Sequence, residues 1–259
     1  MSAKMTSNWI GVWTLYEREV RRFVKVYAQT LIAPVVTTLL FLAVFALALG
    51  DGRSEIAGVP FVDFLAPGLV MMAVAQNAFA NTSSSIVIAK VQGNIVDTLM
   101  PPLTAHELTL AFALGGATRG VAVGVLTALA MAPFVEIGIA HGGYALFHLL
   151  AASLLLSLIG IAGGIWSEKF DHIAAVTNFV VTPLAFLSGT FYSLDRLPEP
   201  FVWVALLNPF FYMIDGFRHG LIGYADGPLG IGLAVLVAAN AALWFGCWRM
   251  FRTGYKLKA

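Results

Sequence analysis

The sequence predicts an all-α integral membrane protein. It is expected to have six transmembrane helices, an N-terminal cytoplasmic interfacial helix, and an extracellular re-entrant helical hairpin between the fifth and sixth helices. Of 259 residues, 59% are hydrophobic and 11% are charged, and the mean hydropathy is +0.84. A soluble domain is only about 45–50% apolar. The apolar residues also fall into runs long enough to cross a hydrocarbon core of about 30 Å.

Residues 1–30 are predicted to form an amphipathic helix that lies on the membrane. Aromatic and apolar residues recur at three- and four-residue steps and form one stripe, which comprises Trp9, Trp13, Tyr16, Val20, Phe23 and Tyr27. Arg18, Arg22 and Lys25 fall on the opposite face, flanked by Glu17 and Glu19. The pattern is typical of a helix on an anionic membrane surface. A solvated helix packed on a soluble partner is the alternative.

Residues 31–259 are predicted to form one transmembrane domain. Hydropathy places its six spans at about 31–49, 64–84, 108–133, 144–165, 173–191 and 229–248. After the second span, a short helix is expected from about Lys90 to Met100, where a Pro-Pro pair ends it. Thr104 and Glu107 then match the S/T-x-x-E capping box, so the third helix is predicted to begin there.

Residues 192–223 are apolar and aromatic, yet prolines interrupt them too often for one straight span. Pro198, Asn208 and Pro209 mark the breaks, so two short half-helices that enter the membrane and turn back are predicted. Such backbone must be covered by protein or line a water-filled cavity. Asp215 and Arg218 are three residues apart and can pair on one helix face. An internal tie is favoured for this pair over substrate binding.

The basic residues predict the orientation, because short loops rich in Lys and Arg face the cytoplasm. One side of the predicted topology collects Lys4, Arg18, Arg21, Arg22, Lys25, Lys90, Lys169, Arg249, Arg252, Lys256 and Lys258. The other side has Arg53, Arg196 and Arg218. Both termini are therefore expected to be cytoplasmic in a multi-pass plasma-membrane protein. Residues 192–223 are then on the outer side.

Small residues at four-residue steps predict close helix packing. One series in the third span comprises Gly116, Gly120 and Gly124, and one in the sixth comprises Ala234, Ala238, Ala242 and Gly246. Between the glycines of the third span stands Arg119, the one ionisable residue well inside a predicted span. A charge at this depth marks a functional or packing-critical site, or else an arginine that extends to the headgroups. The sequence leaves both readings open.

Several motifs of enzymatic chemistry are absent from the sequence. It has no G-x-x-x-x-G-K-[ST] phosphate loop and no Gly-x-Ser-x-Gly elbow. His106 and Glu107 begin an H-E-x-x-H pattern, but Leu110 stands where the second histidine is needed. We therefore expect no catalytic residue, no metal site and no cofactor in this chain. Nucleic-acid binding has no support either.

Four stretches carry a resemblance to a known family: VYAQTLIAPVV, FLAPGLVMM, GNIVDTLMPPLTAHEL and FLSGTFYSLDRLPEPFVWVALLNPFFYMIDGFRHGL. The chain resembles the permease subunit of ABC-2 type exporters, in the branch that includes nodulation-factor and daunorubicin-resistance permeases. The last stretch is the most specific, because a proline-flanked half-helix, an Asn-Pro break and a Gly-Phe-Arg follow one another as in that family.

The resemblance implies a function for the whole chain. It would be a transport subunit in the bacterial inner membrane, working as a homodimer with two copies of a separate ATPase subunit that holds ATP and Mg. The substrate would be an amphipathic drug, lipid, glycolipid or polysaccharide. The helix at Gln92, Asn94, Asp97 and Leu99 would couple to the ATPase, and Asp97 and Glu107 would meet basic residues there.

Two other function classes remain as alternatives. An ion-gradient-driven secondary transporter would need inverted repeats and acidic residues at mid-membrane, and the spans contain neither. A lipid-modifying membrane enzyme would need a catalytic constellation, and none was found.

Overall fold

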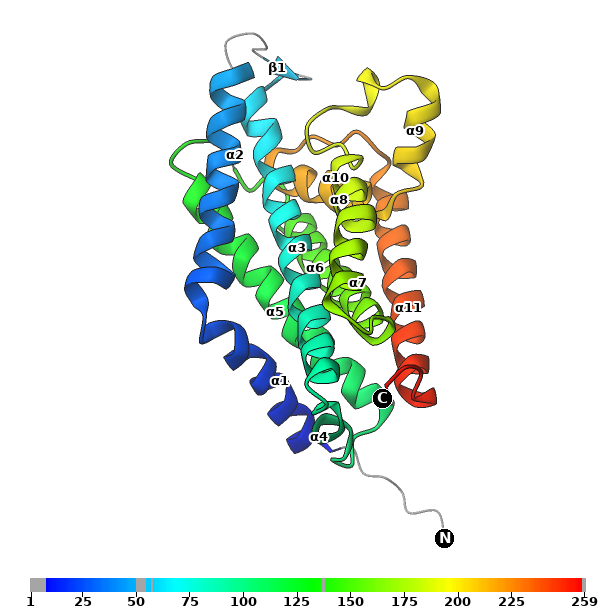
Figure 1. Ribbon diagram of the computed structural model, residues 1–259. Helices are drawn as coiled ribbons and strands as arrows, with labels where there is room; N and C mark the ends of the chain where they lie inside the picture. The colour runs from blue at the N-terminus through cyan, green and yellow to red at the C-terminus, as the bar shows by residue number, and fades with distance from the viewer. Residues whose placement is uncertain (1–7, 50–54, 57, 137, 258–259) are drawn as a thin grey trace.

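The computed structural model describes residues 8–49, 55–56, 58–136 and 138–257. Figure 1 shows a bundle of long helices with two distinct ends. One end carries the short helix α4 (Ile95–Leu99) together with the beginning of the first helix, and we call it the α4 end. The opposite end carries helix α10 (Pro209–Ile222), and we call it the α10 end. Of the basic residues that predict the orientation, Lys4, Arg53 and Lys258 lie outside the described residues.

Five helices in the described part are long and apolar enough to cross a membrane. They are the continuous helix Ala28–Ala48, α3 (Phe61–Val91), α5 (Ala105–Met131), α6 (Gly142–Trp166) and α11 (Leu229–Thr253). The predicted spans at 31–49, 64–84, 108–133, 144–165 and 229–248 overlap these helices. Helix α3 continues well beyond the predicted span, to Val91.

The fifth predicted span, 173–191, is wrong in extent. The helix runs from Phe170 to Phe186. It belongs with the shorter apolar helices of 10–17 residues and not with the five long ones. It consists of α7 (Phe170–Val176), the π-helical turn η2 (Thr177–Val181) and α8 (Thr182–Phe186). It ends early because the Ser188 hydroxyl donates to the Ala185 carbonyl and Gly189 takes φ = 72°, a left-handed conformation that ends helices.

Two π-helical turns interrupt the helices on one side of the bundle. Turn η1 (Ala28–Ile32) leads into α2 (Ala33–Leu49), and η2 leads into α8. A proline follows each turn two residues later, Pro34 in one case and Pro183 in the other. A proline ring clashes with the carbonyl four residues before it and lacks an N–H, so a wider turn just ahead of it relieves the clash.

The N-terminal helix α1 (Trp9–Val24) turns an unexpected face to the bundle. Its buried residues are Val12, Leu15, Glu19 and Phe23, whereas Trp9 and Trp13 are exposed. Glu19 was predicted to flank a solvated polar face, and this is wrong, because the residue is fully buried. Only residues 25–27 separate α1 from η1, so the predicted surface helix and the first span follow one another without a long loop.

The loop elements are smaller than the sequence suggested. The helix predicted at 90–100 is only α4, because Lys90 still belongs to α3 and Gly93 takes φ = 75° between the two helices. At the α10 end, β1 (Glu55–Ile56) pairs with β2 (Val59–Pro60) in an antiparallel hairpin that hydropathy does not predict. The capping box at the start of α5 is confirmed, with both of its reciprocal hydrogen bonds present.

The segment predicted to be re-entrant contains η3 (Leu194–Arg196), α9 (Glu199–Leu206) and α10. Helices α9 and α10 are bent by 84° at a break that includes Asn208. The sharp bend agrees with the two half-helices predicted from the prolines. Asn208 produces the break, because its side chain accepts a hydrogen bond from the Phe210 N–H at 3.0 Å and caps α10.

Small residues of α5 allow the central helices to pack closely. A Cβ atom at Gly116 would lie 2.3 Å from Ser157 Oγ of α6, and one at Gly124 would lie 2.6 Å from Val74 of α3. The predicted packing role of this series is thereby confirmed. The series in α11 differs, because Ala234, Ala238 and Ala242 are exposed and a Cβ at Gly246 would meet nothing within 4 Å.

Candidate functional site

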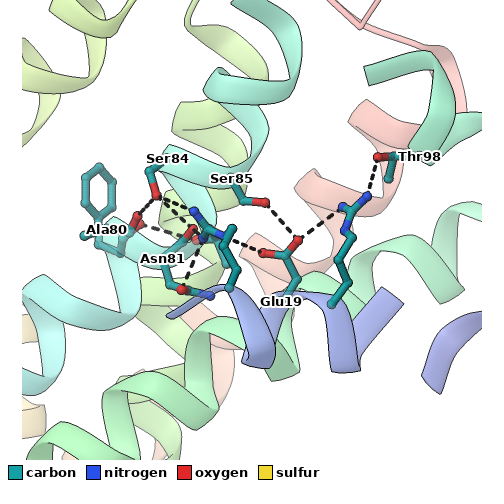
Figure 2. A network of polar contacts seen from close by, with 10 residues as sticks. Glu19, Ala80, Asn81, Ser84, Ser85 and Thr98 are labelled. Atoms are coloured by element: carbon teal, nitrogen blue, oxygen red, sulfur yellow. Dashed lines mark hydrogen bonds and ion pairs between the residues drawn. The ribbon is translucent and has the colours of Figure 1, made fainter. Parts of the chain in front are cut away.

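A buried polar cluster joins α1 to α3 and α4 at the α4 end of the bundle. Figure 2 shows Glu19 at its centre. Glu19 Oε1 accepts from Ser85 Oγ at 2.8 Å and from Arg18 Nη2 at 3.2 Å, and Glu19 Oε2 lies 3.5 Å from Arg22 Nε. We call this group the Glu19 cluster; its members are Arg18, Glu19, Arg22, Asn81, Ser84, Ser85 and Thr98.

The two arginines of the Glu19 cluster extend to other helices. Arg22 donates to Ser84 Oγ at 3.1 Å, to Asn81 Oδ1 at 3.2 Å and to the Asn81 carbonyl, all on α3. Arg18 donates to Thr98 Oγ1 of α4 at 2.9 Å. Burial lowers the pKa of Arg22, and the Glu19 carboxylate opposes that shift. The cluster therefore fixes α1 against both α3 and the short helix α4.

A glycine of α5 makes room for Glu19. A Cβ atom at Gly115 would lie 2.6 Å from Glu19 Cβ, closer than real Cβ contacts. A side chain of any size at this position would push α1 away from the bundle. The absence of a side chain at Gly115 therefore allows Glu19 to be buried against α5.

The predicted coupling residues lie beside this cluster. Gln92, Asn94 and Asp97 are exposed, and Leu99 is half-buried. The neighbouring Ile95 and Thr98 are buried and anchor α4 to the rest of the chain. A groove of about 910 Å³ runs between α1 and this segment, with Arg18, Arg22, Asp97 and Thr98 among its lining residues.

Glu107, also predicted to meet a partner, makes its observed contacts within the chain. Its side chain is buried, and its carboxylate accepts from the Asn8 N–H at 2.6 Å and from the Thr104 N–H at 2.7 Å. It therefore caps α5 and holds the start of α1 at the same time. These contacts favour an internal role over the predicted contact with an ATPase.

At the α10 end, Arg218 is the centre of a second buried network. Its side chain is fully buried, and its guanidinium stacks on the Phe64 ring with 3.8 Å to the centroid. It donates to the Gly189 carbonyl at 2.7 Å and to the Phe64 carbonyl at 3.3 Å. Three segments are joined in this way: the start of α3, the turn after α8, and α10.

The carboxylate within 4.0 Å of the Arg218 guanidinium is Asp226, and the predicted partner Asp215 attracts Arg218 from farther away. Arg218 Nη1 lies 3.7 Å from Asp226 Oδ2, whereas Asp215 accepts from the backbone N–H groups of Asp226 and Gly227 at 2.7 and 3.0 Å. Asp215 thus shapes the turn that brings Asp226 to Arg218. Spacing along one helix could not reveal a partner that lies on the following loop.

Other residues of this network also escaped sequence reasoning. Tyr224 donates to Asp226 at 2.6 Å, and the Ser193 hydroxyl donates to the same oxygen. Burial raises the pKa of Tyr224 to about 12, and the hydrogen bond to Asp226 adds to the rise. Of the predicted breaks, Pro198 precedes the first turn of α9, and Pro209 is the first residue of α10.

Arg119 lies in the middle of α5 and is held by a neighbouring helix. Its Nη2 donates to Asn77 Oδ1 of α3 at 2.8 Å. The sequence left open whether this arginine extends to the headgroups. Its bond to Asn77 instead holds it against the middle of α3.

Comparisons with known proteins identify the family. A family model described as ABC-2 type transporter matches residues 11–222. The chain belongs to the ABC-2 type transporter family. It is 36% identical over 251 residues to the inner membrane transport permease YadH of Escherichia coli K12, covering 97% of this chain and 98% of the relative.

More distant relatives support the same branch of the family. Nodulation protein J of Rhizobium meliloti is 25% identical over 88% of this chain and 87% of that protein. Nodulation protein J of Bradyrhizobium diazoefficiens is 27% identical over 95% and 93%. The predicted resemblance is therefore confirmed. The protein is a multi-pass membrane permease of the ABC type, similar to a bacterial inner membrane protein, and its family implies an ABC ATPase as partner.

Proposed function

We propose that this chain is the membrane-spanning subunit of an ATP-driven exporter that moves an amphipathic substrate outward. The sequence contains no phosphate loop, and in our proposal ATP is hydrolysed by a separate subunit, as the family implies. In our proposal two copies of the chain associate with two copies of that ATPase, and ATP and Mg are bound there. The family match over residues 11–222 is the observation that carries the proposal.

The Glu19 cluster supports a specific coupling route. Asp97, Asn94 and Gln92 are exposed at the α4 end, where a partner subunit can reach them. Arg18 links α4 to α1 through Thr98, and Glu19 links α1 to α3 through Ser85. A force applied to α4 would therefore reach two further helices through side-chain contacts. We propose that ATPase movement enters the membrane domain by this route.

We also propose an orientation for the chain in the membrane. The α4 end faces the cytoplasm together with both termini, and the α10 end faces outward. The α9–α10 pair then lies at the outer face, where it shapes the exit for substrate and supports the dimer. The greater number of Lys and Arg residues on the side assigned to the cytoplasm supports this orientation.

Co-purification tests the proposal. The chain should isolate with a separately encoded ATPase and show ATP hydrolysis only as a complex. Asp97→Lys reverses a charge on α4, and we expect it to reduce co-purified ATPase severalfold. Glu55→Lys makes the same charge change at an exposed position of β1, at the other end of the bundle, and should leave the complex intact.

Two outcomes would contradict parts of this proposal. A monodisperse chain that transports without any ATPase, driven by an ion gradient, would replace the proposal with the secondary-transporter alternative. Equal effects of the two charge reversals would remove α4 from the coupling route while leaving the exporter assignment in place.

A further inference from the structure

A groove of about 550 Å³ opens between α2, α3 and the helix at 170–186. Its wall combines rings and amides: Phe41 and Phe186 are among its apolar residues, and Gln76 and Asn77 are among its polar ones. Gln76 is exposed although it stands near the middle of α3, a span-length helix. An exposed amide at that depth is costly against lipid tails. The groove is therefore suited to a ligand that has both polar and apolar parts.

A positive charge lies directly behind this wall. Asn77 lines the groove, and its Oδ1 accepts from Arg119 Nη2 at 2.8 Å. The buried Nε of Arg119 has no hydrogen-bond partner among the described residues. Within the same residues, no carboxylate lies within 4.0 Å of this guanidinium. Arg119 thus carries a charge inside a spanning helix with only a neutral amide as its partner.

A second positive group reaches the same part of α3 from α1. Arg22 bonds to Asn81, one turn along α3 from Asn77. Glu19, the carboxylate of that region, is already engaged by Ser85 and by Arg18 and Arg22. A cation in the groove would meet repulsion, whereas an anion would supply the missing counter-charge.

We propose that this groove binds the anionic headgroup of an amphiphile, with Arg119 as the charge that recognises it and Asn77 as the residue that positions Arg119. A phosphate group suits the site, because the Arg119 guanidinium, which lies behind Asn77, attracts its negative charge. The phenyl rings of the groove accommodate the hydrocarbon part. The inference rests on the proposed export function and narrows its substrate class to anionic amphiphiles.

The test is a binding measurement on the purified permease in neutral detergent, without any ATPase. Dioctanoyl phosphatidic acid and dioctanoylglycerol share their chains and differ in the phosphate, and native mass spectrometry reports the binding of each. We expect the acid to bind about tenfold or more tightly than the neutral lipid. Arg119→Gln should abolish the difference, and Arg119→Lys should keep part of it. Arg249→Gln, at an exposed arginine of α11, should leave it unchanged.

A second variant covers the case in which Arg119→Gln does not fold. Asn77→Asp keeps the arginine but places a carboxylate 2.8 Å from it, so the charge is neutralised inside the chain. The preference for the phosphate lipid should again disappear, in a protein whose Arg119 is better paired than before. In both variants the preference for the phosphate lipid should disappear for one reason: the groove no longer has the uncompensated charge of Arg119 behind it.

Three outcomes would overturn the inference. The preference could persist in Asn77→Asp, or it could fall equally in Arg249→Gln, which would indicate a general surface effect. Inorganic phosphate could compete as well as the phosphatidic acid does, which would exclude an amphiphile site. A failed co-purification with an ATPase would contradict the proposed function and leave this binding result unaffected.

Discussion

Glu19 is a carboxylate that the chain buries completely, and its neighbours explain how. Ser85 and Arg18 donate to one of its oxygens, and Arg22 lies beside the other. Removing one member of such a group leaves the remaining charges without compensation in a desolvated place. Glu17, two residues earlier, pairs with Arg21 at 2.6 Å on the exposed side of the same helix. The two glutamates therefore offer a matched comparison.

Glu19→Gln should lower the free energy of unfolding by about 1–3 kcal/mol, because Arg18 and Arg22 lose their counter-charge. Glu17→Gln should change it by less than about 0.5 kcal/mol, since exposed pairs contribute little. Thermal unfolding of the detergent-purified protein measures both. Equal shifts in the two variants would contradict the assignment of Glu19 as the centre of the cluster.

Gly115→Ala should displace α1 from the bundle, because the new methyl group would lie 2.6 Å from Glu19 Cβ. Such overpacking costs about 1–3 kcal/mol. Gly246→Ala, in the interior of α11, adds the same methyl group where nothing lies within 4 Å. It should leave stability unchanged or raise it slightly, since alanine favours helix more than glycine. Limited proteolysis after α1 would reveal its release, and similar digestion of both variants would contradict this prediction.

At the scale of elements, the α9–α10 pair is held in place mainly by side-chain contacts with other segments of the chain. Arg218 contacts the start of α3, the turn at Gly189 and Asp226 of the following loop. Asn208 adds a hydrogen bond from its amide to the Leu184 carbonyl of α8 at 2.8 Å. The 84° bend therefore has a fixed geometry even though α9 is only 8 residues long.

Arg218→Ala should impair assembly and export more than ATP hydrolysis, because it removes the ties among three segments far from the α4 end. Arg218→Lys should not restore them, since one ammonium cannot stack on Phe64 and reach both carbonyls. The yield of monodisperse protein and the ATPase activity of the assembled fraction are the measurements. Arg196→Ala, at an exposed position of η3, is the control. Wild-type export in Arg218→Ala would contradict this prediction and leave the segment with a membrane-anchoring role only.

At the scale of the whole molecule, hydropathy and capping predicted most of the helices. The five long spans stand out because each carries an apolar run, and the Thr104 and Glu107 pair located the start of α5. The end of the helix at Phe186 escaped, since Leu187 and Phe191 are as apolar as the residues within it. The burial of Glu19 also escaped, because amphipathicity analysis places every charge toward water. Its site exists only through Gly115 and Ser85, which belong to other helices.

The proposed orientation predicts which positions a membrane-impermeant maleimide reaches in intact cells. In a Cys247→Ser background, Gly143→Cys at the start of α6 should be labelled from outside, because its side chain would face open space. Asn94→Cys, next to α4, should be labelled only after the membrane is permeabilised. The opposite pattern would invert the proposed topology.

The turn at Ala28–Ile32 has a mechanical consequence. Helix α1 lies against α5, and α2 forms a wall of the groove that Asn77 lines. Only residues 25–27 separate α1 from this turn, so α1 cannot move aside unless α2 tilts with it or these residues change conformation. A flexible Gly-Ser insertion after Tyr27 would therefore uncouple the two helices while leaving every side chain of both in place.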